Sequence, residues 1–397
     1  MTHEPNDAAG VWNELVASLA AAGEILVAPD APTDLATQAA GVLYLVNLLN
    51  SGMEMHVFTA DPFRAEIGRP QDPSKRWGLD CPDAHYSSVS IAADSTYVLR
   101  LAGGSPHYLG VTVTAGSLGT AGVRHIGGLS SPGALVAADD GSVELVVGPS
   151  AVGVNAIDTT VGGSSLSIRQ FLYDWDTEVP HRLTIERVAG PARDEARQAE
   201  LVLERVRRLA RFMATSSVTW HGFVADLRER AHNTVLPINP LASQYGGTPD
   251  NAYGSGHLEL ADDEAAIIEV TPPPCHYWNV QFGDHWFQSL DYTYRQTALN
   301  GFQAHLDHGR FVGVIAHDDP GIANWFDTCA NRELPMTYRW QLARIPRNEL
   351  PTPSLRVVKR AVLDDAVPTW VRRVTAAERQ ASLDARRRAV LRRFGRG

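Results

Sequence analysis

Cysteines, long apolar runs and secretion signals are all scarce or missing in this 397-residue chain. Its three cysteines (Cys81, Cys275, Cys329) are few and odd in number, which favours a reducing compartment over a disulfide framework. The most apolar run, Val42 to Leu49, is far shorter than the ~20 residues that span a bilayer. The first ten residues lack the basic start and apolar stretch of a signal peptide. These absences predict a cytoplasmic protein without an integral membrane span.

An excess of positive charge is missing as well. The chain has 35 Lys and Arg against 45 Asp and Glu, a formal net charge of −10 at pH 7. Because nucleic acids are bound through clustered positive charge, this balance argues against a nucleic-acid partner. The hydrophobic share of 44% is typical of a soluble globular protein, and the length predicts two or three structural units.

The motifs of metal, serine-hydrolase and nucleotide sites are also absent. No His-x-His or His-Glu-x-x-His pair occurs among the histidines. The stretch Gly103-Gly-Ser105-Pro-His107 misses the second glycine of the G-x-S-x-G elbow. Gly116, Gly119 and Gly122 are regularly spaced, but no helix is predicted after them to bind a phosphate. We therefore expect neither a metal nor a cofactor.

Two segments of the chain repeat one another at a nearly constant offset of 167 to 170 residues. Their shared order over about ninety residues argues against chance, although each match is weak alone. The matches are Pro82-Asp83-x-x-Tyr86 with Pro249-Asp250-x-x-Tyr253, His107-Tyr108 with His276-Tyr277, Asn155-x-x-Asp158-Thr159 with Asn324-x-x-Asp327-Thr328, and Arg169 with Arg339.

Both copies are filled by short alternating or β-branched runs separated by Gly, Pro and Asp turns. Thr96 to Leu101 and Tyr108 to Thr114 are examples in the first copy, and Tyr277 to Phe282 and Phe311 to Ala316 in the second. The pattern predicts an α+β fold that is mainly β. It would have two tandem diverged antiparallel β-sandwich or jelly-roll-like modules with N-terminal, inter-module and C-terminal helices.

Helices are predicted outside the two copies. Val11 to Ala22 has helical spacing, Thr33-Asp34 can cap a helix to about Leu49, and the segment from Pro191 to about Val235 holds two helical stretches. Thr375-Ala-Ala-Glu378 is a capping box for a basic last helix to about Arg393. The expected units are an N-terminal helical segment (1–80), the first β-module (81–190), a helical linker (191–236), the second β-module (237–350) and the C-terminal basic helix (351–397).

The last helix carries Arg386-Arg387-Arg388 and Arg392-Arg393. One interpretation is a solvated helix docked by Leu383, Val390 and Leu391, with cations at its C-terminal end. The other is a surface for a membrane or an anionic partner. The sequence leaves both open.

Several motifs resemble a known family. They are Trp77-Gly-Leu-Asp-Cys-Pro-Asp-Ala-His-Tyr86, Tyr97-Val-Leu-Arg100, Arg169-Gln-Phe-Leu-Tyr-Asp-Trp-Asp-Thr-Glu178, and Asn324-Trp-Phe-Asp-Thr328 followed by Arg339-Trp340. From about Trp12 to Phe394 the chain resembles actinobacterial proteins with the domain of unknown function numbered 1214. The resemblance implies β-sandwich or jelly-roll-like modules with added helices and no established activity. Many such proteins have a Pro-rich segment where this chain has Asp327-Thr328-Cys329.

Residues shared by both copies are first interpreted as scaffold. Asp83 and Asp250 are expected to form Asx-type turns, and Asn155 and Asn324 to organise loops through backbone bonds. Arg169 and Arg339 fall on predicted strands, where an inward arginine needs a carboxylate. Their expected partners are Asp158 or Asp327; the alternative is that they clamp a substrate carboxylate.

A site is predicted where the copies differ. The second copy has Trp278 for Leu109 and Trp325 for Ala156, and it adds Trp286 and several histidines. Large aromatics with a few polar groups suit a small-molecule pocket, although tryptophans also fill cores. The candidate catalytic residues are Asp327 as base and His276 or His285 as acid–base partner; the candidate binding residues are Trp325, Trp286, Trp278, Arg339, Tyr253 and Asn324.

The favoured function is binding, with or without chemical transformation, of an apolar or aromatic small molecule bearing a carbonyl, hydroxyl or carboxylate. The pocket would lie in the second module and be lined by tryptophan and histidine. The alternative is a non-catalytic carbohydrate-binding or assembly module. A third hypothesis is a homo-oligomer formed through the C-terminal helix.

Overall fold

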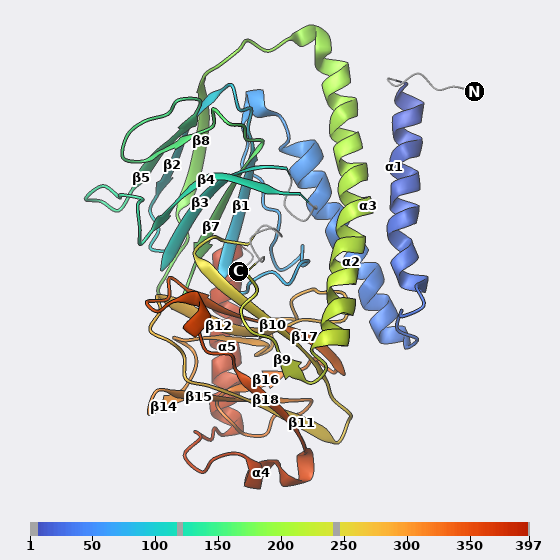
Figure 1. Ribbon diagram of the computed structural model, residues 1–397, viewed down its shortest axis with the longest axis vertical. Coiled ribbons are helices and arrows are strands. Elements are labelled where there is room, and N and C mark those ends of the chain that lie inside the picture. Colours follow the sequence, from blue (N-terminus) through green and yellow to red (C-terminus); the bar gives the residue numbers. More distant parts are fainter. Residues whose placement is uncertain (1–6, 117–121, 241–246, 396–397) are drawn as a thin grey trace.

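The computed structural model describes residues 7–116, 122–240 and 247–395. It confirms the predicted fold class, a mainly β α+β protein with two β-modules and flanking helices. Figure 1 shows the first module above the second, with the N-terminal helices and the long inter-module helix along one side of both.

The first module is a sandwich of two four-stranded sheets. One sheet has the order β1 (Ala84–Ser90), β7 (Ser165–Phe171), β3 (Tyr108–Ala115), β4 (Arg124–Ser131). The other has the order β6 (Ala156–Asp158), β5 (Val143–Gly148), β2 (Thr96–Ala102), β8 (Arg182–Ala189). Inward residues such as Leu99, Val111 and Ile168 form the core between them. Because side chains alternate along a strand, Ser165, Ser167 and Arg169 of β7 face away from this core.

The second module repeats this plan. Its first sheet has the order β10 (Asn251–Glu259), β17 (Glu333–Gln341), β12 (Tyr277–Phe282), β13 (Ala298–Asn300). Its second sheet has the order β14 (Leu306–Asp307), β15 (Arg310–Ala316), β11 (Glu264–Val270), β18 (Ser354–Lys359), and β16 (Trp325–Asp327) pairs with β15. The short β9 (Thr234–Val235) precedes the module. Its sandwich core includes Phe282, Phe326 and Trp340.

Strand register confirms that the two modules have one plan. Arg169 lies opposite Tyr86 on β1 and Gly110 on β3. Arg339 lies opposite the equivalent Tyr253 on β10 and Asn279 on β12. The parallel pairs β5–β6 and β15–β16, unusual in sheets that are otherwise antiparallel, also correspond.

Helices α1 (Ala8–Gly23), α2 (Leu35–Met53) and α3 (Gln198–Arg230) pack together through a common apolar cluster. The shorter turns around them are η1 (Glu24–Val27), η2 (Glu54–Phe58), η3 (Pro62–Arg64) and η4 (Glu195–Arg197). The prediction of two helical stretches between residues 191 and 235 is wrong, because α3 is one helix of 33 residues. Gly222 lies inside this helix, at a position where an added Cβ would meet no atom within 4 Å.

The segment Ala8–Val27 is long and apolar enough to cross a membrane by length and composition, a test that core helices and signal sequences also pass. It is the one such segment in the described ranges.

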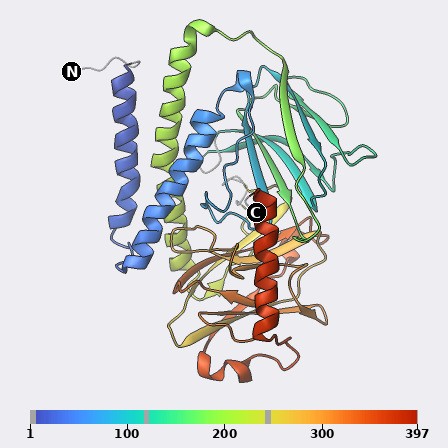
Figure 2. The ribbon, with the colours of Figure 1, turned by 180° about the vertical axis from the view of Figure 1, so that it is seen from behind.

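The C-terminal part docks on both modules. After η6 (Arg347–Glu349), η7 (Arg360–Val362) and α4 (Leu363–Ala366), helix α5 (Ala376–Phe394) begins with the predicted capping box. Figure 2 shows α5 running along the second module to the module junction. Val390 and Phe394 are buried against Leu172, Trp175 and Tyr292, so the apolar face expected to dimerise is covered within the chain.

The basic character of α5 also has an internal explanation. Arg379, Arg386 and Arg393 recur every seventh residue on one face, and all three are buried. Arg386 donates to the carbonyl of Ala298 at 3.0 Å, and Arg393 donates to that of Pro82 at 2.7 Å. The interpretation of α5 as a solvated helix is therefore wrong for this face, whose arginines bind backbone carbonyls of both modules.

Candidate functional site

The two modules meet through reciprocal contacts between equivalent residues. The Tyr108 hydroxyl of the first module donates to Asp250 of the second at 2.9 Å. The equivalent Tyr277 of the second module donates to Asp83 of the first at 2.6 Å. The expectation of Asx-type turns at Asp83 and Asp250 is wrong: within the described residues neither carboxylate accepts from a neighbouring backbone amide. They join the modules instead.

Of the two carboxylates, Asp83 accepts the larger number of hydrogen bonds among the described residues. It is 1% exposed and also accepts from the Trp175 indole at 2.7 Å and from the Asn300 amide at 2.7 Å. The amide of Asn279 donates to the same carboxylate at 3.2 Å. With this many donors, the buried carboxylate is well satisfied and acts as a structural centre.

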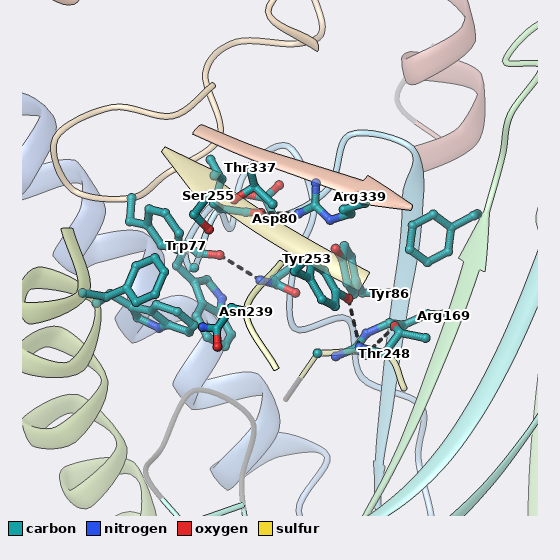
Figure 3. A pocket seen from close by; sticks show the side chains of 18 residues that line it. Trp77, Asp80, Tyr86, Arg169, Asn239, Thr248, Tyr253, Ser255, Thr337 and Arg339 are labelled. Carbon is teal, nitrogen blue, oxygen red and sulfur yellow. Dashed lines mark hydrogen bonds between the residues drawn. The ribbon is translucent and has the colours of Figure 1, made fainter. Parts of the chain in front are cut away.

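A cavity of about 120 Å³ lies beside this junction. The first sheets of both modules contribute the equivalent pairs Arg169 with Tyr86 and Arg339 with Tyr253. In the view of Figure 3 these four side chains gather toward one side and Trp77 lies toward the other. The apolar walls come from α3 and from two loops: Trp77, Leu79, Trp220, Phe223 and Phe287. The site thus draws on both modules and on the helical layer.

Arg339 is a buried cation at the cavity. It is 5% exposed and donates to Gln281, to Asn279 at 3.2 Å and to the carbonyl of Leu79 at 3.3 Å. No ion pair with a carboxylate is found for it in the described part of the chain. Asn279 links it to Asp83, because its oxygen accepts from Arg339 while its nitrogen donates to Asp83. Arg339 is therefore held in place by neutral dipoles.

Arg169 occupies the equivalent position in the first module. It donates to the Thr248 hydroxyl at 2.8 Å, and its guanidinium lies 5.9 Å from the centre of the Tyr86 ring. The guanidinium of Arg339 lies 5.6 Å from the Tyr253 ring in the same manner.

The expected ion pairs of these arginines with Asp158 or Asp327 are wrong. Asp327 pairs with Arg295 at 2.7 Å, and Asp158 accepts from Ser150 and Thr160. Both aspartates lie on a strand of the opposite sheet of their sandwich, while the arginines face outward.

Asp80 is the one acidic residue among the described residues that line the cavity. It is 2% exposed, and the backbone amide of Ser289 donates to it at 3.4 Å. Burial raises the pKa of Asp80 to about 7, despite the opposing effects of Ser289 and Arg76. A carboxyl group with this pKa changes its charge near neutral pH.

The predicted tryptophan and asparagine residues lie in separate places. Trp278 belongs to the core of the second sandwich, and Trp286 packs on the helical layer, where its indole donates to Thr37 at 2.7 Å. Trp325 packs on the outer face of the second sheet, beside α4. Asn324 organises a loop as expected, through bonds to the backbone of His305 and Val312. Asn155 makes the equivalent bonds in the first module.

The predicted acid–base residues are also apart. His276 lies at the module junction, and Asp327 lies on β16, where it pairs with Arg295. His285 belongs to a buried cluster in which the Glu333 carboxylate contacts it at 2.6 Å, His257 at 2.9 Å and Arg228 at 2.8 Å. Burial alone would raise the pKa of Glu333, but hydrogen bonds from both histidines and the charge of Arg228 hold it well below its usual range.

Of the residues predicted for the site, the structure brings only Arg339 and Tyr253 to the cavity. The site was predicted at residues that differ between the copies, whereas the cavity is lined by residues that both copies share, such as Arg169 and Arg339. Two features of the sequence pointed to the cavity. They are the interpretation of Arg169 and Arg339 as a substrate clamp and the motif from Trp77 to Tyr86. Within the described ranges, no group of three or more His, Cys, Asp or Glu residues is placed to hold a metal ion.

The comparisons with known proteins found similar solved structures. The chain is similar to the crystal structure of an uncharacterised protein from Burkholderia cenocepacia, with a TM-score of 0.83 and 30% identity over 89% of this chain and 97% of that one. The VPA0106 protein of Vibrio parahaemolyticus matches with a TM-score of 0.46 and 9% identity, covering 86% of this chain and 100% of that one. No family model and no curated protein matches. Membership of the domain of unknown function 1214 family stays a prediction.

Proposed function

We propose that this chain, which belongs to the same family as the uncharacterised Burkholderia cenocepacia protein, binds a small carboxylate with an apolar body in the inter-module cavity. The observation that carries the proposal is Arg339, a buried cation at the cavity wall with no ion pair among the described residues.

Electrostatics favour an anion in this place. A buried cation is costly unless it is paired or well hydrogen-bonded. The partners of Arg339 are neutral amides and a carbonyl, so the approach of a carboxylate would add an ion pair that the protein itself does not supply. A planar guanidinium suits a carboxylate, because two parallel N–H groups can donate to its two oxygens. Arg169 offers a second guanidinium at the same cavity.

The volume and the lining of the cavity limit the apolar body of the ligand. A cavity of ~150 Å³ in another protein accommodates benzene. The present cavity of about 120 Å³ therefore suits a body no larger than one ring. Trp77, Trp220 and Phe287 provide aromatic faces for such a body. A benzoate-like acid meets both requirements.

Asp80 favours a second candidate function, a proton transfer on the bound acid. A general acid or base works best with a pKa near the working pH, and burial brings the pKa of Asp80 to about 7. Asp80 would then exchange a proton with a hydroxyl group of the ligand, becoming charged when it donates and neutral when it accepts, while the arginines hold the ligand's carboxylate.

Calorimetric titration with benzoate and with benzamide tests the binding proposal. The two probes have the same shape, but only benzoate carries a charge, so benzoate should bind at least about tenfold more tightly. Arg339→Gln should remove this preference. Arg386→Gln is the matched control, because it removes a buried arginine of similar exposure that lies in α5, away from the cavity. Equal affinities for the two probes in the wild-type protein would sink the proposal.

We also propose a cytoplasmic location for the protein.

We further propose that the protein associates with itself. Helices α1 and α2 expose the apolar side chains of Trp12, Val16, Val42 and Val46, and a second copy would cover them. Light scattering on the purified full chain should give twice the monomer mass. A monomer at about 50 µM would contradict self-association.

A further inference from the structure

We propose that a groove on the outer face of the first module's first sheet binds an acidic oligosaccharide. The groove measures about 850 Å³ and lies between strands β1, β3 and β7 on one side and α3 with η2 on the other. It is distinct from the smaller cavity, although Arg169 lines both.

Two rows of hydroxyl groups form the floor of the groove. Ser88, Ser167 and Thr112 lie opposite one another across the three strands. Two residues further along each strand, Ser90, Ser165 and Thr114 form a second row. Strands lie ~4.8 Å apart and alternate residues ~6.7 Å apart, so six hydroxyls form a regular grid. Each can donate and accept, as the hydroxyls of a sugar do.

The charged side chains that line the groove are arginines. Arg208 and Arg211 of α3 and Arg169 of β7 line it, and no Asp or Glu in the described ranges does. Glu204, one turn earlier on α3, pairs with Arg211 at 2.8 Å and lies 3.5 Å from Arg208, which leaves a net positive wall. In a chain with a net charge of −10, this local excess points to a ligand with carboxylates.

His56 is an independent indication of a ligand. It lines the groove, is 6% exposed, and its Nε2 has no hydrogen-bond partner among the described residues. Burial, with the charges of Arg208 and Arg211, lowers the pKa of His56 to about 4, so the ring is neutral at pH 7. A neutral buried imidazole with a free nitrogen is suited to exchange a hydrogen bond with a hydroxyl group.

In the second module, a segment of the chain covers the corresponding outer face of the first sheet. The equivalent row is Ser255, Thr337 and Gln281. There the Gln281 amide donates to the carbonyl of Asp80 at 2.9 Å, so the segment that contains Asp80 lies over the row. The small cavity lies beside this covered row, with Ser255 and Thr337 in its lining. The groove of the first module has room for a chain of about three sugar rings, by its volume of about 850 Å³.

Titration of the full chain with trigalacturonate tests the proposal, with maltotriose as the neutral probe of similar size. Trigalacturonate should bind at least about tenfold more tightly than maltotriose, because only it pairs with the arginines. The double variant Arg208→Gln/Arg211→Gln should lose about tenfold or more in affinity. Arg230→Gln is the matched control, since Arg230 is another exposed α3 arginine with one carboxylate partner, and it does not line the groove.

A second pair of variants tests the hydroxyl grid without changing charge. Thr112→Val keeps the shape of the side chain and should weaken trigalacturonate binding roughly threefold to tenfold. Thr184→Val on β8, in the other sheet of the same module, should leave it unchanged. No binding by the wild-type chain at about 10 mM probe, or equal binding by wild type and the double variant, would overturn the proposal. Because none of these substitutions lines the smaller cavity, benzoate binding should persist in all of them.

Discussion

The imidazole rings of His107 and His276 stack at 4.0 Å between ring centres, and each Nε2 meets the other residue's backbone carbonyl at 2.8–2.9 Å. Because a carbonyl only accepts, both rings must carry their proton on Nε2. These two histidines are equivalent residues of the two modules, so the contact joins each module to the other in the same way.

Removing one ring should loosen the junction. His107→Ala deletes the stacking and the hydrogen bond from His107 Nε2 to the carbonyl of His276, and we expect a loss of about 2–3 kcal/mol in the free energy of unfolding. Chemical denaturation measures this loss. His308→Ala serves as control because that side chain is 92% exposed. A loss no larger than that of the control would contradict the structural role of the stack.

Glu333 should stabilise the fold in a pH-dependent way. Its pKa is lower in the folded state than in the unfolded chain, so its contribution is present above about pH 4.5 and is lost as the pH falls further. Glu333→Gln should therefore cost about 2–4 kcal/mol at pH 7 and progressively less below about pH 4. Glu259→Gln is the matched control, since Glu259 lies opposite Glu333 on β10 but is exposed. A cost that does not change with pH would contradict this assignment.

Asp80 should have the opposite effect. Its pKa is raised to about 7 in the folded state, so the wild-type protein should lose stability as the pH rises from about 4 to about 7. Asp80→Asn cannot ionise, and it should be more stable than wild type by up to about 4 kcal/mol at pH 8. This advantage should disappear near pH 4. Denaturation of both proteins across this range checks the sign, and a variant less stable than wild type at pH 8 would disprove it.

The same group should affect the ligand. Above about pH 7 the ionised Asp80 would repel a bound carboxylate, so benzoate affinity should fall as the pH rises through this value. Calorimetry at about pH 6 and about pH 8 measures the change. The affinity of Asp80→Asn should stay constant, and an equal fall in the variant would assign the effect to another group.

Asn155 and Asn324 make equivalent loop bonds at different depths. Asn324 is 3% exposed, whereas the bonds of Asn155 are exposed to solvent. Asn324→Ala should therefore cost about 2–3 kcal/mol and Asn155→Ala about 1 kcal/mol, because an unsatisfied buried group loses its partner without gaining water. Equal costs in thermal or chemical unfolding would contradict this ranking.

Much of the fold could be predicted from the sequence. The alternation of apolar residues predicted the strands, because it depends only on neighbouring residues. The constant offset between matching residues predicted two modules, because repeated motifs in the same order indicate a repeated fold. The single helix α3 was missed because residues 215–219 in its middle, Thr-Ser-Ser-Val-Thr, have low helix propensity. The role of α5 was missed because the carbonyls that its arginines bind lie on distant parts of the chain.

The candidate site was harder to predict. Alternation shows which residues share a face, but it does not show which face the helices cover. Arg169 and Arg339 therefore resembled inward scaffold arginines, although they face outward toward the junction. For Trp278 and Trp340 the sequence favoured a core only slightly over a pocket, and these side chains fill the second sandwich.

A crystal structure of the protein with saturating benzoate tests the central claim most directly. We predict that the carboxylate lies within hydrogen-bond distance of the Arg339 guanidinium and that the ring packs against the aromatic side chains of Trp77, Trp220 and Phe287. If benzoate saturates the protein by calorimetry but the cavity holds only water in the crystal, or the ring occupies the groove on the first module, the account is contradicted.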